Sequence, residues 1–295
     1  LSNEARMVFS AMIRKMMNRR SAMIFSALQP ERYDEAVNVG PDIAVFDLED
    51  GTAPDRKAEA RETVTPVFRR DNGGPFLKYL RINHPRTLDG LRDMVAVADW
   101  TSPPDGLLLP KIESADEVRQ VSDTVCTVHP DIDLMPIIES PRGLENVMDI
   151  ANAAPQVVML LLGSDDLSGT IGSDRSWDAL AYARGRVAAA AGDAGIEAMD
   201  GAFYDPEDEP GLIEELRRAA SMGFTGKASY HAGQIPHIHA AFTPDVGDVA
   251  EARRILAAAA ADPIGNTRLD GRMVNAAIVK RARRLLDIAE RRGVT

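Results

Sequence analysis

Short apolar runs alternate with helical patterns along most of the chain. Eight of these runs are rich in aliphatic residues on both faces, which is typical of strands buried in a parallel sheet. The predicted strands are Ala22–Leu28, Ile43–Asp50, Phe76–Asn83, Gly106–Ile112, Leu134–Ser140, Val157–Leu162, Glu197–Phe203 and Gly226–His231.

Helical patterns fill the intervals between these runs. The first predicted helix begins at Pro54 and ends near Phe68, and the others follow Thr87, Ser114, Pro141, Tyr182 and Pro210. After Ser114, the segment Ser-Ala-Asp-Glu places an acid three residues beyond a capping serine. Eight strands with intervening helices predict an α/β fold, a TIM (β/α)₈ barrel. An open doubly wound sheet is disfavoured, because no GxGxxG follows the first strand and no P-loop pattern occurs.

The ends of the chain differ from this alternating core. Residues 1–19 have amphipathic helical spacing and predict a leading helix, with a transit segment as the alternative. Residues 20–245 form the predicted barrel domain. Residues 246–295 form a helical extension, with an alanine-rich helix over Val246–Ala261 and a basic helix over Asn275–Arg292. Such an extension suits a lid, an oligomer contact, or both.

Charge and cysteine content narrow the classes of function. The chain has 34 Lys and Arg against 45 Asp and Glu, a formal net charge of −11, which argues against nucleic-acid binding. The single cysteine, Cys126, cannot form an internal disulfide, and no apolar run reaches the ~18 residues of a membrane helix. We therefore expect a cytoplasmic protein, or one of an organellar matrix if residues 1–20 belong to a transit segment. An anionic substrate would need a locally positive pocket.

Charged residues gather at the carboxyl ends of the predicted strands, where TIM-barrel enzymes carry their catalytic groups. Glu139 and Asp166 follow adjacent strands and can share an ion; carboxylate ligands without Cys or a His cluster favour Mg²⁺. Arg81 is suited to a bidentate pair with a substrate carboxylate. The other charged strand ends contain Asp47-Leu48-Glu49-Asp50, Lys111, Asp200 and Lys227. The competing interpretation is that these charges are ion pairs that close the barrel.

These strings, taken in order, resemble the citrate lyase β-subunit-like family of the HpcH/HpaI aldolase superfamily, which includes malyl-CoA and citramalyl-CoA lyases. The resemblance runs from about residue 20 to residue 292. Its motifs are Arg20-Ser21, Asp47 to Asp50, Arg81-Ile82-Asn83, Leu109 to Ser114, Ile138 to Gly143, Gly163 to Asp166, Asp200-Gly201, Gly226-Lys227 and Leu269 to Val274.

The resemblance implies a TIM barrel whose C-terminal extension reaches a neighbouring subunit, in a homo-oligomer such as a trimer or hexamer. It implies Mg²⁺ held by Glu139 and Asp166, and substrate binding by Arg81, with Arg20 and Lys111 as further substrate-binding candidates. The implied reaction is reversible carbon–carbon cleavage of a 3-hydroxyacyl thioester, often a CoA ester, into a 2-oxo acid and an acyl thioester.

The catalytic base is left open among Glu49, Asp50 and Asp270, the last of these brought by the lid of another subunit. Three positions depart from the family pattern: Ser26-Ala27-Leu28 replaces a Pro-Gly turn, Ala232 follows His231 where proline is common, and Asn275 stands where aspartate is frequent. Two alternatives to the lyase therefore remain: an aldolase or thioesterase acting on a related hydroxy acid or acyl ester, and a non-catalytic β-subunit of a larger assembly.

Overall fold

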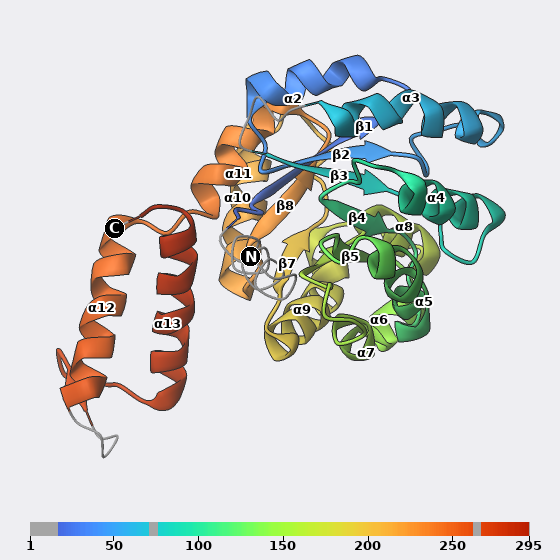
Figure 1. Cartoon of the computed structure of the whole chain (residues 1–295). Coiled ribbons are helices and arrows are strands. Elements are labelled where there is room, and N and C mark those ends of the chain that lie inside the picture. Colours follow the sequence, from blue (N-terminus) through green and yellow to red (C-terminus); the bar gives the residue numbers. More distant parts are fainter. Residues whose placement is uncertain (1–16, 71–75, 262–266, 295) are drawn as a thin grey trace. The chain divides into compact units, whose positions relative to one another are not determined.

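The computed structural model describes residues 17–70, 76–261 and 267–294, which fall into two compact units. The first unit, Arg19–His239, contains eight parallel strands that close into a barrel in chain order (Figure 1). These are β1 (Ser21–Ser26), β2 (Ile43–Asp47), β3 (Leu77–Arg81), β4 (Gly106–Leu109), β5 (Asp133–Ile138), β6 (Met159–Leu162), β7 (Glu197–Asp200) and β8 (Gly226–Ser229). The predicted TIM-barrel fold is confirmed.

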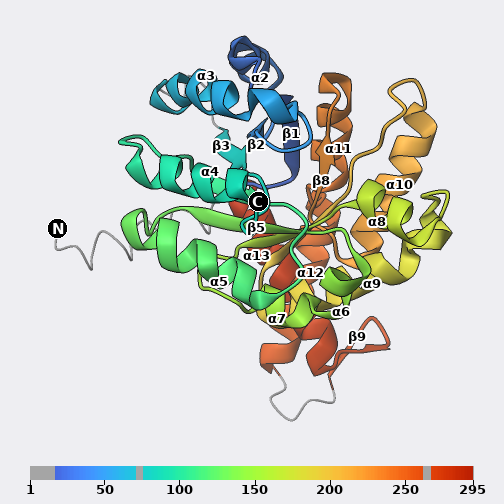
Figure 2. The same ribbon diagram turned by 90° about the vertical axis from the view of Figure 1, so that its right-hand side faces the viewer.

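Helices surround the barrel strands (Figure 2). They are α2 (Tyr33–Val39), α3 (Lys57–Arg69), α4 (Leu88–Asp99), α5 (Ala115–Val121), α6 (Pro141–Glu145), α7 (Val147–Ala151), α8 (Ser164–Ile171), α9 (Trp177–Ala194), α10 (Glu209–Met222) and α11 (Ile235–Ala241). Short 3₁₀ turns cover Pro30–Arg32, Pro54–Arg56 and Ala232–Gln234, and a π turn covers Ser122–Cys126. The predicted capping box is present at α5, where Ser114 and Glu117 each bond the other's backbone N–H.

Seven of the eight strands end earlier than the apolar pattern predicts, and β6 ends at Leu162 as predicted. The run expected to extend to Asp50 stops at Asp47, because the Asp47 carboxylate accepts hydrogen bonds from the backbone N–H of Glu49 (2.8 Å) and of Gly51 (2.7 Å). This side-chain to backbone bonding turns the chain out of the sheet. The charged residues after the strand are therefore held in a tight loop at its carboxyl end.

Alternation along each strand decides which side chains enter the barrel. The Tyr79 hydroxyl of β3 donates to Asp133 of β5 (2.6 Å), and Arg19 donates to the same carboxylate (2.6 Å). These residues come from non-adjacent strands, so they meet inside the barrel. Gly106 makes room for the ring, since a Cβ there would lie 2.4 Å from Tyr79. Every second side chain of a strand points to the same face. Arg81, two residues after Tyr79, and Glu139, six after Asp133, therefore also point into the barrel, nearer the carboxyl ends of the strands.

Two other strand-end charges face the helices instead. The Lys227 ammonium donates to Asp200 (2.8 Å) and to Glu215 of α10 (2.5 Å), while Arg184 of α9 donates to Asp200 (2.9 Å). Asp200 and Lys227 are fully buried. This buried ion network joins strands β7 and β8 to the helix layer. Asp200 and Lys227 are therefore structural ion-pair residues, as the competing interpretation of the strand-end charges proposed.

Replacing Lys227 with methionine is expected to lower the free energy of unfolding by about 3–5 kcal/mol, because it leaves a buried carboxylate short of a cation. Burial alone would raise the pKa of Asp200, but Lys227 and Arg184 outweigh it and lower that pKa. A lowered pKa adds stability above the unfolded-state value of ~3.9, and this stability is lost as the pH falls. In the variant the pKa of Asp200 should rise, so the stability difference from the wild type should be largest near pH 7 and should shrink as the pH falls toward 4, as measured by urea unfolding. Arg217→Met, which removes an exposed ion pair, is the control and should change stability by less than ~1 kcal/mol.

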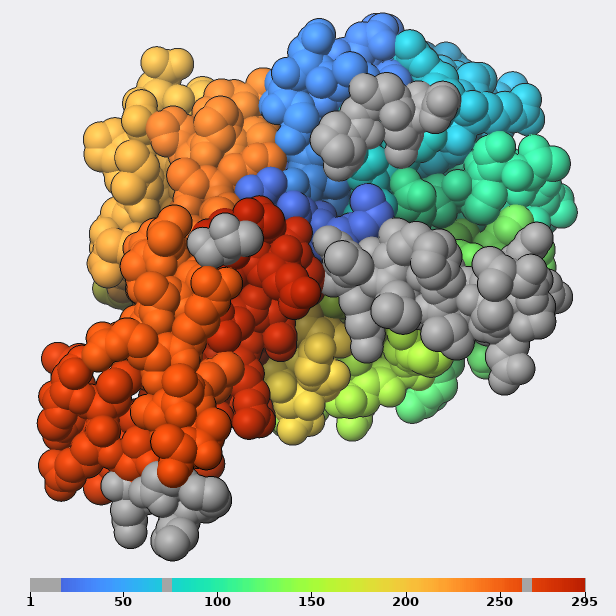
Figure 3. Space-filling model, turned by 60° about the vertical axis from the view of Figure 1, so that its left-hand side comes forward, coloured from blue at the N-terminus to red at the C-terminus, as the bar shows by residue number. Residues whose placement is uncertain are grey.

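The second unit contains the C-terminal helices, of which α12 (Val246–Ala261) and α13 (Ala276–Arg291) pack along each other (Figure 3, orange to red). Between them, β9 (Arg268–Leu269) and β10 (Arg272–Met273) form a hairpin whose two-residue turn is Asp270-Gly271, with φ angles of +48° and +79°. Such a turn is typical of Asp-Gly. The Asn275 side chain caps α13 by accepting from the N–H of Ile278 (3.0 Å).

The expected leading helix over residues 1–19 lies almost wholly outside the described residues. Among the helices that the structure describes, none is long and apolar enough to cross a membrane.

Candidate functional site

A cavity of about 300 Å³ lies at the carboxyl ends of the barrel strands. Aliphatic residues that include Ile24, Ile137 and Leu161 line part of it. Its charged lining consists of Asp50, Arg81, Glu139, Asp165 and Asp166. The cavity therefore combines an apolar wall with charges of both signs, at the end of the barrel where TIM-barrel enzymes carry their active sites.

Glu139 follows β5, and a backbone N–H fixes its carboxylate. The backbone N–H of Lys111 donates to its carboxylate at 2.6 Å, and Lys111 adopts a left-handed conformation with φ of +54°. A non-glycine residue at positive φ is uncommon and indicates a locally fixed backbone. The side chain crosses Gly163, where an added Cβ would lie 2.3 Å from Oε2 of Glu139. Glycine at position 163 thus leaves the space that the carboxylate occupies.

Asp166 lies in the first turn of α8 and shares the cavity with Glu139. Burial raises the pKa of Glu139 to about 8, and the nearby Asp166 carboxylate adds to this increase. Each of two neighbouring carboxylates makes ionisation of the other less favourable, and a nearby cation stabilises the ionised form of both.

The donor set fits Mg²⁺. In the part of the chain that the structure describes, no group of three or more His, Cys, Asp or Glu residues could enclose a metal. Mg²⁺ needs no such cage, since it keeps several waters and binds through one or two carboxylates together with substrate oxygens. Glu139 and Asp166 would supply those carboxylates, and Gly163, which has no side chain, leaves room beside Glu139.

Arg81 lines the cavity, and one edge of its guanidinium group is bonded to Asp47. Its Nε and Nη2 donate to the two oxygens of Asp47 at 2.6 and 2.5 Å, and Nη1 lies 3.4 Å from Glu49. Asp47 and Arg81 are register partners on β2 and β3, which places their side chains next to each other. The pair fixes the guanidinium plane, while Nη1 faces the Glu49 carboxylate and the residue lines the cavity.

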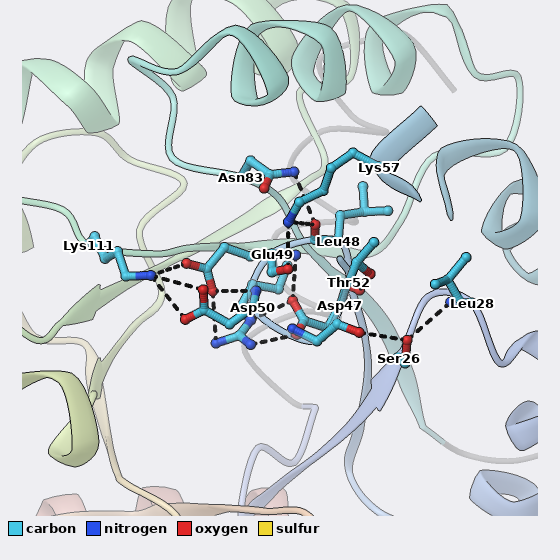
Figure 4. A network of polar contacts seen from close by, with 12 residues as sticks. Ser26, Leu28, Asp47, Leu48, Glu49, Asp50, Thr52, Lys57, Asn83 and Lys111 are labelled. Carbon is cyan, nitrogen blue, oxygen red and sulfur yellow. Dashed lines mark hydrogen bonds and ion pairs between the residues drawn. The ribbon is translucent and has the colours of Figure 1, made fainter. Parts of the chain in front are cut away.

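The loop after β2 is braced by neighbouring elements (Figure 4). Lys57 donates to the carbonyls of Leu48 (2.7 Å) and Glu49 (2.6 Å), and Asn83 also donates to that of Leu48 (3.1 Å). The Ser26 hydroxyl donates to the Gly51 carbonyl (2.8 Å), so a position that departs from the family pattern takes part in this bracing. The loop is thus tied to β1, β3 and α3.

The two carboxylates of this loop share Lys111. The Lys111 ammonium bonds Glu49 and lies 3.0 Å from Asp50. Burial raises the pKa of Glu49, whereas Lys111 outweighs partial burial at Asp50 and lowers the pKa of that carboxyl. Of the two, Asp50 lines the cavity and its side chain is 58% exposed, while Glu49 is buried between Arg81 and Lys111. Asp50 is therefore the more accessible group.

One expected residue of the barrel unit lies away from this cavity, and another belongs to the second unit. Arg20 lies at the amino end of β1, opposite to the cavity end, and forms a two-pronged pair with Asp42, with both contacts at 2.8 Å. Asp270 lies in the β9–β10 turn of the second unit and bonds Arg254 (2.5 Å). The other expected residues lie together, either lining the cavity or bonded to a residue that lines it: Glu49, Asp50, Arg81, Lys111, Glu139 and Asp166.

Asp47, Gly163, Tyr204 and Tyr230 belong to this site but were not predicted as functional residues. Asp47 carries a signal, because it is the first of three carboxylates in the four residues that end the second predicted strand. The tyrosines carry none, because a single aromatic residue after a strand is as typical of packing as of a binding wall.

Asp47→Asn is expected to lower the free energy of unfolding by about 3–5 kcal/mol, because it leaves the buried Arg81 charge without its partner. The new amide also directs N–H donors at groups that themselves donate. Urea unfolding at pH 7 measures the change. Asp34→Asn is the matched control, since the Asp34–Arg70 pair is exposed and should contribute less than ~1 kcal/mol. Equal effects of the two substitutions would contradict this interpretation of Asp47.

Comparison with known proteins places this geometry in a family. The model of the HpcH/HpaI aldolase/citrate lyase family matches residues 20–232. The chain is 29% identical to citrate lyase subunit beta of Escherichia coli K12 over 95% of its length and 96% of that protein. It is 30% identical to the L-malyl-CoA/β-methylmalyl-CoA lyase of Cereibacter sphaeroides, over 89% and 92%.

Solved structures agree with these sequence relatives. CitE from Mycobacterium tuberculosis, in complex with magnesium, acetoacetate and coenzyme A, has a TM-score of 0.74 and 31% identity, over 93% of this chain and 99% of that one. The barrel, the ordered motifs and these likenesses lead to one conclusion: the chain is an enzyme of the HpcH/HpaI aldolase/citrate lyase family.

Proposed function

We propose that this protein is a Mg²⁺-dependent carbon–carbon lyase. Its substrate would be a 3-hydroxyacyl thioester such as malyl-CoA or citramalyl-CoA, cleaved reversibly into a 2-oxo acid and an acyl-CoA. The observation that carries this proposal is the convergence of Glu139, Asp166 and Arg81 on one cavity at the carboxyl ends of the strands. The magnesium, acetoacetate and coenzyme A bound to the related CitE support it.

In this proposal Glu139 and Asp166 hold the metal, and Arg81 holds the carboxylate of the 2-oxo acid. Because Asp47 occupies Nε and Nη2, the substrate carboxylate meets Arg81 from its Nη1 side. Bound Mg²⁺ would supply Lewis-acid polarisation of the neighbouring carbonyl oxygen. Lys111 positions the site through both ends of the residue: its N–H holds Glu139, and its ammonium holds Glu49 and Asp50.

We assign the proton transfer to Asp50, which faces the cavity. During cleavage the substrate hydroxyl gives its proton to this carboxylate, and the C–O bond becomes the carbonyl of the 2-oxo acid. The electron pair of the broken carbon–carbon bond passes to the α-carbon of the thioester, which then takes up a proton. Burial raises the pKa of Asp50, but Lys111 outweighs it and lowers that pKa, so the carboxyl is ionised at neutral pH.

Asp50→Asn is expected to lower kcat by ~10²–10⁴-fold, the contribution typical of a positioned acid–base group. Binding of Mg²⁺ and pyruvate, measured by calorimetry, should change little, because Glu139, Asp166 and Arg81 remain. Asp116→Asn, at an exposed carboxylate paired with Arg119 on α5, is the control. Full activity of Asp50→Asn would move the base to Glu49 or Asp270.

Product analysis tests the proposed function. Purified protein with Mg²⁺ is incubated with malyl-CoA and, separately, with citramalyl-CoA. A lyase releases the 2-oxo acid and acetyl-CoA in equal amounts without free thiol. A thioesterase releases free CoA and the hydroxy acid instead, and a non-catalytic subunit releases neither.

Oligomerisation is a separate part of the proposal. We propose a homo-oligomer, a trimer or hexamer, in which the helical extension contacts a neighbouring subunit. Light scattering on the full chain, compared with a variant that ends at residue 245, measures this. A monomeric full chain would contradict it.

A further inference from the structure

Two tyrosines line the cavity beside its charged groups. Tyr204 follows β7 and Tyr230 follows β8, and their ring centroids lie 5.7 Å apart. The Arg175 guanidinium lies 4.3 Å from the centroid of the Tyr204 ring and forms an ion pair with Asp165. The Tyr204 ring therefore packs against both a second ring and a cation, which restricts its movement.

These tyrosines are hydrogen-bond donors in a lining that has few of them. Apart from the carboxyl groups, the described side chains of the lining that carry an N–H or O–H are those of Arg81, Ser164, Tyr204 and Tyr230. Arg81 is assigned to the carboxylate of the 2-oxo acid. Ser164 is buried, and an added Cβ at Gly201 would lie 2.5 Å from its hydroxyl oxygen. The tyrosine hydroxyls are therefore the donors left for the other half of the substrate.

The two hydroxyls differ in what they bond. The Tyr204 hydroxyl bonds the Asp165 carboxylate and the Tyr230 hydroxyl. Burial raises the pKa of Tyr230, so this residue keeps its proton at neutral pH. The bond from Tyr204 acts in the other direction and lowers the pKa of Tyr230, which is the effect of a bond that the Tyr230 oxygen accepts. Tyr230 thus accepts from Tyr204, which leaves its own O–H to donate into the cavity.

The proposed cleavage creates negative charge on the acyl half of the substrate. When the carbon–carbon bond breaks, its electron pair passes to the α-carbon and is shared with the thioester carbonyl oxygen, which becomes an enolate. The four acidic residues of the described lining oppose this charge, so a donor has to face the enolate oxygen. The Arg81 charge opposes the effect of burial on the pKa of Tyr230, which places the tyrosine within electrostatic reach of the guanidinium that holds the other half.

We infer that Tyr230 donates a hydrogen bond to the thioester carbonyl oxygen and stabilises the enolate that forms there, and that Tyr204, packed against Arg175, orients the Tyr230 hydroxyl. No proton leaves the tyrosine in this step: the hydroxyl proton of the substrate passes to Asp50, and the α-carbon takes up its proton from water afterwards. The inference rests on the proposed function and adds to it one catalytic residue, Tyr230, and one positioning residue, Tyr204.

Tyr230→Phe keeps the ring and removes the donor. We expect kcat for cleavage of malyl-CoA or citramalyl-CoA to fall by ~10²–10³-fold, the loss typical of removing one oxyanion donor. Calorimetric binding of Mg²⁺ and pyruvate should match the wild type, because Arg81, Glu139 and Asp166 remain. Tyr182→Phe is the matched control, since Tyr182 lies on α9 and is 69% exposed. A kcat within a few-fold of the wild type in Tyr230→Phe would overturn the inference and leave the lyase function intact.

Tyr204→Phe tests the orienting role. Its ring and the contact with Arg175 remain, so we expect a smaller loss of kcat than in Tyr230→Phe, with little change in KM. In the double variant the second substitution should add little, because Tyr204 acts through a hydroxyl group that is already absent. Losses that multiply in the double variant would show that Tyr204 does not act through Tyr230.

Proton exchange keeps this test apart from that of the proposed function. Acetyl-CoA is incubated in D₂O with the protein, Mg²⁺ and oxalate, which occupies the place of the 2-oxo acid and cannot condense, so exchange of the methyl protons reports enolate formation alone. Tyr230→Phe should exchange ~10²-fold more slowly than the wild type. Exchange that depends on Tyr230, in a protein that cleaves neither thioester, would support the inference and reject the proposed function. Equal exchange in the two proteins, or none in the wild type, would overturn the inference.

Discussion

Glu139→Gln is expected to abolish Mg²⁺-dependent cleavage. The amide keeps the size of the side chain and can still accept the hydrogen bond from Lys111. It removes one of the two negative charges that we propose hold the metal, while Asp166 remains. The loss in kcat/KM should reach at least the ~10²–10³-fold that follows removal of one preorganised electrostatic group.

Two further measurements distinguish loss of Mg²⁺ binding from loss of the fold in Glu139→Gln. Calorimetric titration with Mg²⁺ should show weaker binding in Glu139→Gln, and thermal unfolding should show that the fold is retained. Glu59→Gln, at an exposed residue of α3, is the control and should match the wild type in both. If Glu139→Gln binds Mg²⁺ as tightly as the wild type, Glu139 is not a metal ligand.

Gly163→Ala should cause a loss of similar size without touching a charged residue. The added methyl would lie 2.3 Å from Oε2 and 2.4 Å from Cβ of Glu139, far inside van der Waals contact. The Glu139 side chain has to move, and its carboxylate then leaves the position next to Asp166. We expect Mg²⁺ affinity and kcat/KM to fall together, by ~10²-fold or more in the rate.

The chain offers a matched control for this substitution. Gly169 lies on α8, where an added Cβ meets nothing within 4 Å. Gly169→Ala should keep full activity and gain about 0.5–1 kcal/mol of stability, because alanine is favoured over glycine inside a helix. Wild-type activity in Gly163→Ala would show that the space above Gly163 is not needed by Glu139.

The barrel was predictable because each buried parallel strand has its own apolar run. The charged residues at the strand ends were harder to assign, since one residue of register reverses the direction of a side chain. Glu139 lies six residues after Asp133, directly after the end of β5, so its side chain points to the same side, into the barrel. Asp200 of β7 and Lys227 of β8 point outward instead and bind helix residues. The sequence shows both groups as charges after apolar strands, so sequence alone does not separate them.

Other parts of the site depend on tertiary contacts that leave no local pattern. The pairing of Asp47 with Arg81 follows from the register of β2 on β3. Tyr204 and Tyr230 come from different loops and meet at the cavity, and Arg175 stacks on the Tyr204 ring. Arg20 shows that a local motif can also mislead about the site. Arg20-Ser21 resembles the family motif, yet Arg20 lies at the amino end of β1 and is bonded to Asp42.

The central claim is that Glu139 and Asp166 would hold a divalent metal on which carbon–carbon cleavage in this cavity depends. Its most direct test measures 2-oxo acid release from malyl-CoA and citramalyl-CoA, first after complete chelation of divalent metal and then during titration with Mg²⁺. We predict no release in the chelated enzyme and restoration by Mg²⁺ in the wild type, with little or no restoration in Asp166→Ala. Full release with all divalent metal chelated would contradict the account.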